Sequence, residues 1–141
     1  ATLLEKDTFW YSDTPSVPSR TSVDYNMRCC NWAKLSMKGK VFYIFNTHLQ
    51  VDTSADEKYR VKRVEEAAAV LTEIKKVSAT YPVILTGDFN TTIATANDAV
   101  EYLVNEGTLR EPWCRILTAR LAPCIISIRR TLVQSVWIIY L

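Results

Sequence analysis

The sequence predicts an α/β or α+β fold, in which helices pack against a mixed sheet. Two short apolar runs, 41–45 and 82–85, are typical of buried strands, and a helix-like segment separates them. Before the first run, residues 29–36 alternate roughly between apolar and polar, which predicts a neighbouring antiparallel strand. The chain of 141 residues is 48% apolar and 23% charged, which is typical of about one soluble globular domain.

Residues 8–22 are expected to form a long surface loop with an aromatic anchor. The aromatic residues 9–11 precede a stretch that holds Pro15, Pro18 and several short polar side chains. This composition favours an extended or turning chain. Further on, Lys-Gly-Lys at 38–40 predicts the turn between two antiparallel strands.

The segment that begins at Ser54 is predicted to be the long helix of the domain. Ser54 and Glu57 have the spacing of a capping box, which satisfies free amide groups at a helix start. The apolar face at helical spacing consists of Val64, Ala67, Ala68, Leu71, Ile74 and Ser78. Lys62 and Glu66 are expected largely off that face. After the short strand at 82–86, a second helix is predicted from 94 to 105, ending at Gly107.

The composition of the chain changes after Glu111. Residues 1–111 hold all 15 acidic residues and 13 of the 17 basic ones, whereas residues 112–141 hold four arginines and neither an acidic residue nor a glycine. The sequence therefore predicts a partial domain over 1–111 and a divergent or misread tail over 112–141, without paired strands. The apolar stretch 132–141 is too short for a membrane-spanning helix of roughly 20 residues.

The four cysteines are interpreted as structural thiols. Cys29, Cys30, Cys114 and Cys124 contain no Cys-x-x-Cys spacing, which argues against a zinc ribbon or a redox motif. Adjacent residues of a strand point to opposite faces, so Cys29 and Cys30 are badly placed to bond to each other. Free thiols favour a reducing compartment, such as the cytoplasm.

Three polar residues follow the predicted buried strands: His48 ends the first, and Asp88 and Asn90 follow the second. Because strand ends meet at one edge of an α/β sheet, we expect these side chains to face one phosphate-sized space. His48 can protonate a leaving oxygen near neutral pH, or it can be a buried histidine with satisfied hydrogen bonds. Asp88 can hold a metal or orient water, and Asn90 can donate to a phosphate oxygen; alternatively both build an Asx-turn.

The segments around these residues resemble the two central motifs of the endonuclease/exonuclease/phosphatase superfamily. The motifs are Asn-Thr-His-Leu-Gln at 46–50 and Pro-Val-Ile-Leu-Thr-Gly-Asp-Phe-Asn at 82–90. Residues 9–15 resemble the aromatic-Trp-x-Ser-x-Thr-Pro segment of its small microbial branch, residues 28–33 resemble that branch's Arg-x-Cys-x-Trp-Ala strand, and Arg63 matches a helix arginine. The resemblance is collinear over roughly 8–104.

This resemblance implies part of a four-layer α/β/β/α sandwich with mixed sheets, incomplete at both ends. It implies hydrolysis of phosphoesters (nucleic acid, lipid-linked or small) with Mg²⁺ or Mn²⁺ as the cofactor. By position, His48 would stabilise the transition state or act as general acid, and Asp88 would orient water or bind the metal. Asn90 would contact phosphate and water. Arg28 would contact the scissile phosphate, or would be a plain surface arginine.

The chain also departs from the family pattern. The family's first asparagine and its metal-binding glutamate precede the aromatic-Trp segment, where only residues 1–7 stand here and Glu5 has the wrong neighbours. The chain has one histidine, so the family's Ser-Asp-His motif is absent, and metal binding by this chain alone is not expected.

Three hypotheses follow. The first is a Mg²⁺-dependent phosphodiesterase, nuclease or phosphatase that is catalytically incomplete as this chain. The second is a non-catalytic remnant that binds anions or a partner protein, and the third is an unrelated phosphate-binding module. The slightly acidic region 1–111 favours a small or lipid-linked phosphoester over nucleic acid.

Overall fold

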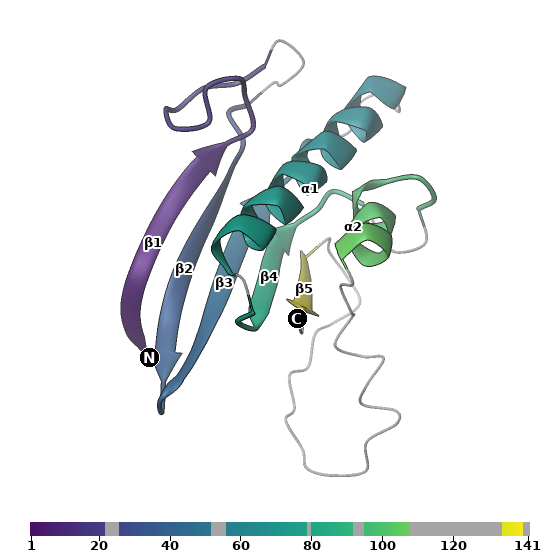
Figure 1. Cartoon of the computed structure of the whole chain (residues 1–141). Coiled ribbons are helices and arrows are strands. Elements are labelled where there is room, and N and C mark those ends of the chain that lie inside the picture. The colour runs from purple at the N-terminus through teal and green to yellow at the C-terminus, as the bar shows by residue number, and fades with distance from the viewer. Residues whose placement is uncertain (22–25, 52–55, 79, 92–94, 108–133, 140–141) are drawn as a thin grey trace, which may run out of the picture.

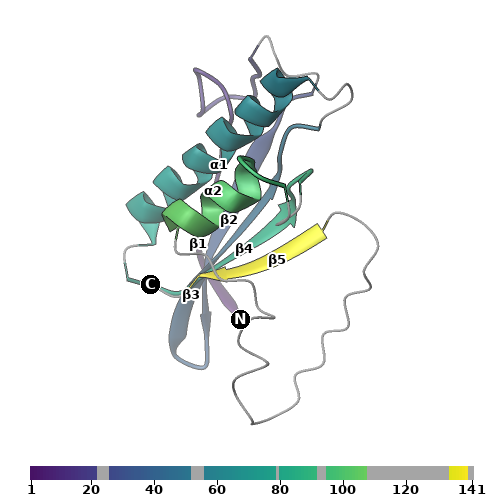
Figure 2. The same ribbon diagram turned by 90° about the vertical axis from the view of Figure 1, so that its right-hand side faces the viewer.

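The computed structural model describes residues 1–21, 26–51, 56–78, 80–91 and 95–107, together with the backbone of 134–139. They form one five-stranded sheet in the order β1-β2-β3-β4-β5, with two helices on one face (Figures 1 and 2). The strands are β1 Thr2–Trp10, β2 Cys29–Met37, β3 Lys40–His48, β4 Val83–Asp88 and β5 Gln134–Ile139. Only β3 and β4 run parallel to each other, while the other neighbours are antiparallel. The predicted mixed sheet is therefore confirmed.

Strand β1 corrects the prediction of a loop from residue 8 onward. Phe9 and Trp10 belong to this strand, where they pair with Cys30 and Cys29 of β2. The charged run Glu5-Lys6-Asp7 and a register shift beside it hide the alternation that would identify a strand from its sequence. The antiparallel pairing with β2 therefore decides the structure of this segment, and the loop begins only after Trp10.

The long helix α1 spans Glu57–Val77, and its cap differs from the predicted one. Asp56 is the N-cap, and its carboxylate accepts a hydrogen bond from the Lys58 backbone amide at 3.0 Å. Ser54 lies outside the described residues. The second helix, α2, spans Ala99–Gly107, so it begins later than the predicted residue 94. Asp98 precedes α2 and accepts from the Ala99 amide at 2.6 Å.

The core lies between the sheet and the helices. From the strands, Cys30, Trp32, Tyr43, Phe45, Val83 and Leu85 are at most 5% exposed, and α1 contributes Ala67, Val70, Leu71 and Ile74. The predicted apolar face of α1 is only partly right. Val64 and Ala68 are half-buried, whereas Lys62 and Glu66, which were expected near the solvent, are buried.

The opposite face of the sheet is not covered by either helix. Because side chains alternate along a strand, Ile44, Asn46 and His48 of β3 point away from the helices, and so do Ile84 and Asp88 of β4. The run 41–45, predicted to be a buried strand, is therefore covered on one face only within the described residues. One sheet and one helix layer correspond to half of a four-layer sandwich.

In the described part of the chain, no helix has the length and apolar composition needed to cross a membrane.

Strand β5 corrects the prediction that the tail contains no paired strand. It runs antiparallel to β4, from Gln134 opposite Asp88 to Ile139 opposite Val83, and so covers that edge of β4 (Figure 2). The short apolar run carries no period of its own, so only its partner strand identifies it. Residues 108–133 lie outside the described residues, as do Cys114 and Cys124, and the division at 111 stays a prediction.

Candidate functional site

His48 and Asp88 face each other at one edge of the sheet. The parallel register pairs these two residues directly, and their side chains approach to 3.7 Å between Nε2 and Oδ2. The imidazole is 54% exposed and the carboxylate 28%. His48 is therefore not a buried core histidine, and its ring is accessible to a ligand.

Gly87 allows β4 to approach β3 beside this pair. Its φ is +143°, and a Cβ at this position would lie 1.9 Å from the Thr47 carbonyl oxygen. No L side chain is compatible with that contact. A glycine directly before Asp88 is thus required to bring the carboxylate opposite His48.

Asp88 and Asn90 form an Asx-turn, which the sequence analysis gave as the structural alternative for these residues. The Asn90 backbone amide donates to Asp88 Oδ1 at 3.0 Å, and Asn90 has a left-handed φ of +49°. The turn does not exclude a second role, because Asp88 Oδ2 faces His48. Asn90 Nδ2 donates to the Leu49 carbonyl at 2.8 Å, and the described residues offer no partner to its second amide hydrogen or to its Oδ1 atom, which a ligand could therefore use.

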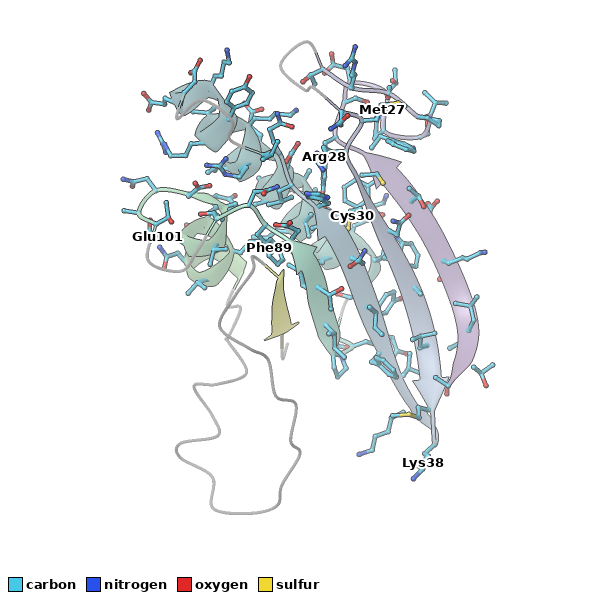
Figure 3. The ribbon with its side chains drawn as sticks, turned by 180° about the vertical axis from the view of Figure 1, so that it is seen from behind. Met27, Arg28, Cys30, Lys38, Phe89 and Glu101 are labelled. Atoms are coloured by element: carbon cyan, nitrogen blue, oxygen red, sulfur yellow. The ribbon has the colours of Figure 1, made fainter. Side chains whose placement is uncertain are left out.

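Arg28 lies at the same end of the sheet. It directly precedes β2, and since β2 is antiparallel to β3, the start of one strand lies beside the end of the other (Figure 3). Arg28 is half-buried, and its buried Nε has no hydrogen-bond partner among the described residues. A guanidinium donor that is buried but unpaired at a sheet edge suits an anion such as phosphate.

The surroundings of His48 keep its imidazole neutral. Partial burial lowers the pKa of His48 below its ordinary value, and the positive charge of Arg28 lowers it further, while the nearby Asp88 carboxylate raises it less. His48 is therefore a hydrogen-bond donor and acceptor without charge at pH 7. A phosphate dianion beside it would raise this pKa and favour the protonated ring.

We expect His48, the chain's single histidine, to titrate below pH 6.5 in NMR spectra. Arg28→Met should raise its pKa and Asp88→Asn should lower it, since each removes a charge that acts in the opposite direction. The folded state binds this proton more weakly than the unfolded state, so this group lowers stability as the pH falls through about 6.5. An unchanged pKa in Arg28→Met would show that the two residues do not interact.

The described residues do not form a metal centre by themselves. No group of three or more His, Cys, Asp or Glu side chains among them is close enough to hold an ion. Mg²⁺ requires near-octahedral oxygen ligands, whereas Asp88 supplies one carboxylate whose Oδ1 already accepts from Asn90. The assignment of a metal to Asp88 stays a prediction.

Sequence reasoning missed a buried polar network behind the site. Arg63 of α1 makes a two-pronged ion pair with Asp98, with Nε to Oδ1 at 2.9 Å and NH2 to Oδ2 at 2.6 Å. The side chains are only 5% and 1% exposed. Glu66 accepts from the Gln50 backbone amide at 2.7 Å. These contacts explain why charged residues of α1 point inward. Of these residues, only Arg63 could be singled out from the sequence, because it matches the family arginine.

A second contact that the sequence did not reveal joins the residue before His48 to the segment after β1. The hydroxyls of Tyr11 and Thr47 are hydrogen-bonded, and Thr47 Oγ1 also contacts the Cys29 carbonyl at 3.1 Å. Burial raises the pKa of Tyr11 well above its ordinary value and that of the Cys30 thiol to about 12. Both groups are therefore neutral, and Cys29 and Cys30 are free thiols.

The candidate site is an open sheet edge within the described part of the chain. A groove of about 590 Å³ lies between the end of β1 and α1, lined among others by Trp10, Tyr11 and Lys62. None of the four candidate residues lines it. Because His48 lies at an open edge and outside this groove, a substrate bound there would need additional protein surface around it.

The chain is similar to solved structures of three Bacteroides proteins. An endonuclease/exonuclease/phosphatase family protein from Bacteroides thetaiotaomicron is 27% identical, with a TM-score of 0.73, over 97% of this chain and 50% of its own. A mannosyl-6-phosphatase from the same species is 26% identical, with a TM-score of 0.72, over 97% and 52%. A family protein from Bacteroides vulgatus is 30% identical, with a TM-score of 0.65, over 78% and 41%.

The chain thus spans about half the length of these proteins, or less. No protein-family model and no curated protein match its sequence. The shared fold agrees with the resemblance of the motifs that end at His48 and Asn90. The chain therefore belongs to the endonuclease/exonuclease/phosphatase superfamily.

Proposed function

We propose that this chain carries part of the active site of a Mg²⁺-dependent phosphoester hydrolase and is catalytically incomplete by itself. The observation that carries the proposal is the approach of His48 to Asp88 at the ends of two parallel strands, with Arg28 and Asn90 at the same edge. The family resemblance and the phosphatase among the similar structures support the same reaction class.

Each of the four residues has a role that its geometry permits. Arg28 Nε and the free amide hydrogen of Asn90 would bind phosphoryl oxygens. The bound anion would raise the pKa of His48, which would then stabilise charge on the phosphoryl group or protonate the leaving oxygen. Asp88 Oδ2, which faces His48 across the edge, would orient the attacking water.

The proposed incompleteness rests on what the chain does not supply. It has one histidine, whereas the family motifs imply a second imidazole on the other side of the phosphate. Among the described residues, no group of three or more His, Cys, Asp or Glu side chains could hold a metal ion. General acid–base assistance alone is typically worth ~10² to 10⁴ in rate, so a half-site should be slow.

For the substrate, we propose a small or lipid-linked phosphoester ahead of nucleic acid. One similar structure is a mannosyl-6-phosphatase, which makes a sugar phosphate the first compound to test. Residues 1–111 hold 15 acidic and 13 basic residues, a slightly acidic balance that does not favour binding to a nucleic-acid backbone.

The test is hydrolysis of mannose 6-phosphate and bis(4-nitrophenyl) phosphate with Mg²⁺ present. We expect this chain to be at least ~10²-fold slower than a full-length relative, because half of the acid–base pair is missing. His48→Ala and Asp88→Ala should remove the residual rate, while Lys76→Ala on the exposed side of α1 should not. A rate that is indifferent to both site substitutions would refute the proposed site. Full activity that both abolish would refute the incompleteness.

The second candidate function is anion binding without turnover. The buried, unpaired Nε of Arg28 favours it, since a charge-assisted hydrogen bond to phosphate needs neither a metal nor a second histidine. Phosphate that shifts the NMR signals of His48 and Asn90, in a chain without measurable hydrolysis, would favour this function over catalysis.

A further inference from the structure

The backbone of Leu49, directly after His48, is hydrogen-bonded through both its amide and its carbonyl to residues of the candidate site. The Leu49 amide donates to the Asp88 carbonyl at 2.9 Å, and the Leu49 carbonyl accepts from Asn90 Nδ2 at 2.8 Å. Leu49 is fully buried. The position of this one residue therefore fixes where the Asn90 amide lies relative to His48.

The next residue is held by α1. The Gln50 amide donates to Glu66 Oε2 at 2.7 Å, and Arg63 NH1 approaches the Gln50 carbonyl at 3.5 Å. Gln50 and Glu66 are each 1% exposed, so the amide–carboxylate bond is shielded from water. A short bond to a charged acceptor in such surroundings is strong and directional.

The His48 ring has no comparably short contact with its charged neighbour. Its distance of 3.7 Å to Asp88 is too long for a hydrogen bond, and about half of the ring is exposed. The position of the imidazole is consequently set by its backbone. That backbone is the end of β3, which continues into Leu49 and Gln50, whose backbone groups are fixed by the hydrogen bonds described above.

We propose that Glu66 is a positioning residue for the phosphate site. Acting through Gln50 and Leu49, it sets the spacing between the His48 ring and the Asn90 amide, and thereby the affinity of the site for a phosphoryl group. This inference rests on the proposed function, because it presumes that these two side chains bind the same anion. Glu66 does not itself touch the ligand.

The test compares three variants of this chain in titrations with inorganic phosphate, followed by the NMR signals of His48 and Asn90. Glu66→Ala should weaken phosphate binding about tenfold, a size typical of losing a supporting hydrogen bond behind a ligand. Glu66→Gln keeps an acceptor oxygen for the Gln50 amide and should bind within roughly threefold of the original chain. Leu71→Ala removes core packing from the same helix and should leave the affinity unchanged.

The same samples separate this proposal from the proposed function. Amide hydrogen exchange of Gln50 should be faster in Glu66→Ala than in Glu66→Gln and Leu71→Ala, relative to the global stability of each. If the unmodified chain binds no phosphate, the proposed function fails, and the positioning role is judged on these rates and on the His48 ring signals. Those signals should move in Glu66→Ala and stay in Leu71→Ala.

Two results would overturn the positioning role. One is an equal loss of phosphate affinity in Glu66→Ala and Leu71→Ala, which would indicate general destabilisation. The other is unchanged affinity and ring signals in Glu66→Ala. If Glu66→Ala does not fold, Glu66→Asp replaces it, since the shorter side chain keeps the charge but withdraws the acceptor from the Gln50 amide.

Discussion

Gly87→Ala is expected to destabilise the fold by at least about 3 kcal/mol, a large part of the roughly 5 to 15 kcal/mol by which a domain is ordinarily stable. The added Cβ would lie 1.9 Å from the Thr47 carbonyl oxygen and 2.8 Å from its carbon, and both are backbone atoms that cannot rotate away. The residue also needs a φ of +143°, which L side chains rarely adopt. Relief would require β4 to move off β3 at the point where His48 meets Asp88.

Gly39→Ala is the matched control for this prediction. Gly39 also has a positive φ, +76°, in the turn between β2 and β3, but a Cβ there has no neighbour within 4 Å. Its replacement should cost about 1 kcal/mol from backbone strain alone. Urea unfolding followed by tryptophan fluorescence measures both variants. Equal losses in the two would show that backbone conformation, and not the contact with Thr47, governs Gly87.

The sequence predicted the elements whose side chains carry their own signal. The apolar runs of β3 and β4 and the helical spacing of α1 each appear within one segment, because burial in the core selects apolar residues there. Strands β1 and β5 carry mixed or unpatterned sequences, and they form through pairing with β2 and β4. Such pairing depends on a distant partner, so a local pattern does not reveal it.

The residues of the candidate site also divide into those that their own segment predicts and those that depend on a distant partner. His48, Asp88 and Asn90 were predicted because each stands directly after an apolar strand and within a family motif. Glu66 and Asp98 were not predicted to be buried, since charged residues are usually exposed and their partners lie far along the chain. The sequence alone therefore does not reveal which charged side chains are buried and paired in the core.

Arg63→Met is expected to cost about 3 to 5 kcal/mol of stability, the usual effect of breaking a buried ion pair from one side. The substitution leaves the Asp98 carboxylate, 1% exposed, without its guanidinium partner. Lys76→Met is the control: Lys76 pairs with Glu73 in the same helix, but it is 70% exposed, and exposed pairs are worth about 0 to 1 kcal/mol. Urea unfolding curves of the two variants measure the difference.

Adding Asp98→Leu to Arg63→Met should recover part of the lost stability, because the double variant no longer buries an unpaired charge. Recovery should stay incomplete, since Asp98 also accepts from the Ala99 amide at the start of α2, and that bond is lost with the carboxylate. A double variant that is as unstable as the sum of both single variants would show that the two residues do not act as a pair. A single Arg63→Met variant as stable as Lys76→Met would mean that water reaches Asp98 and compensates its charge.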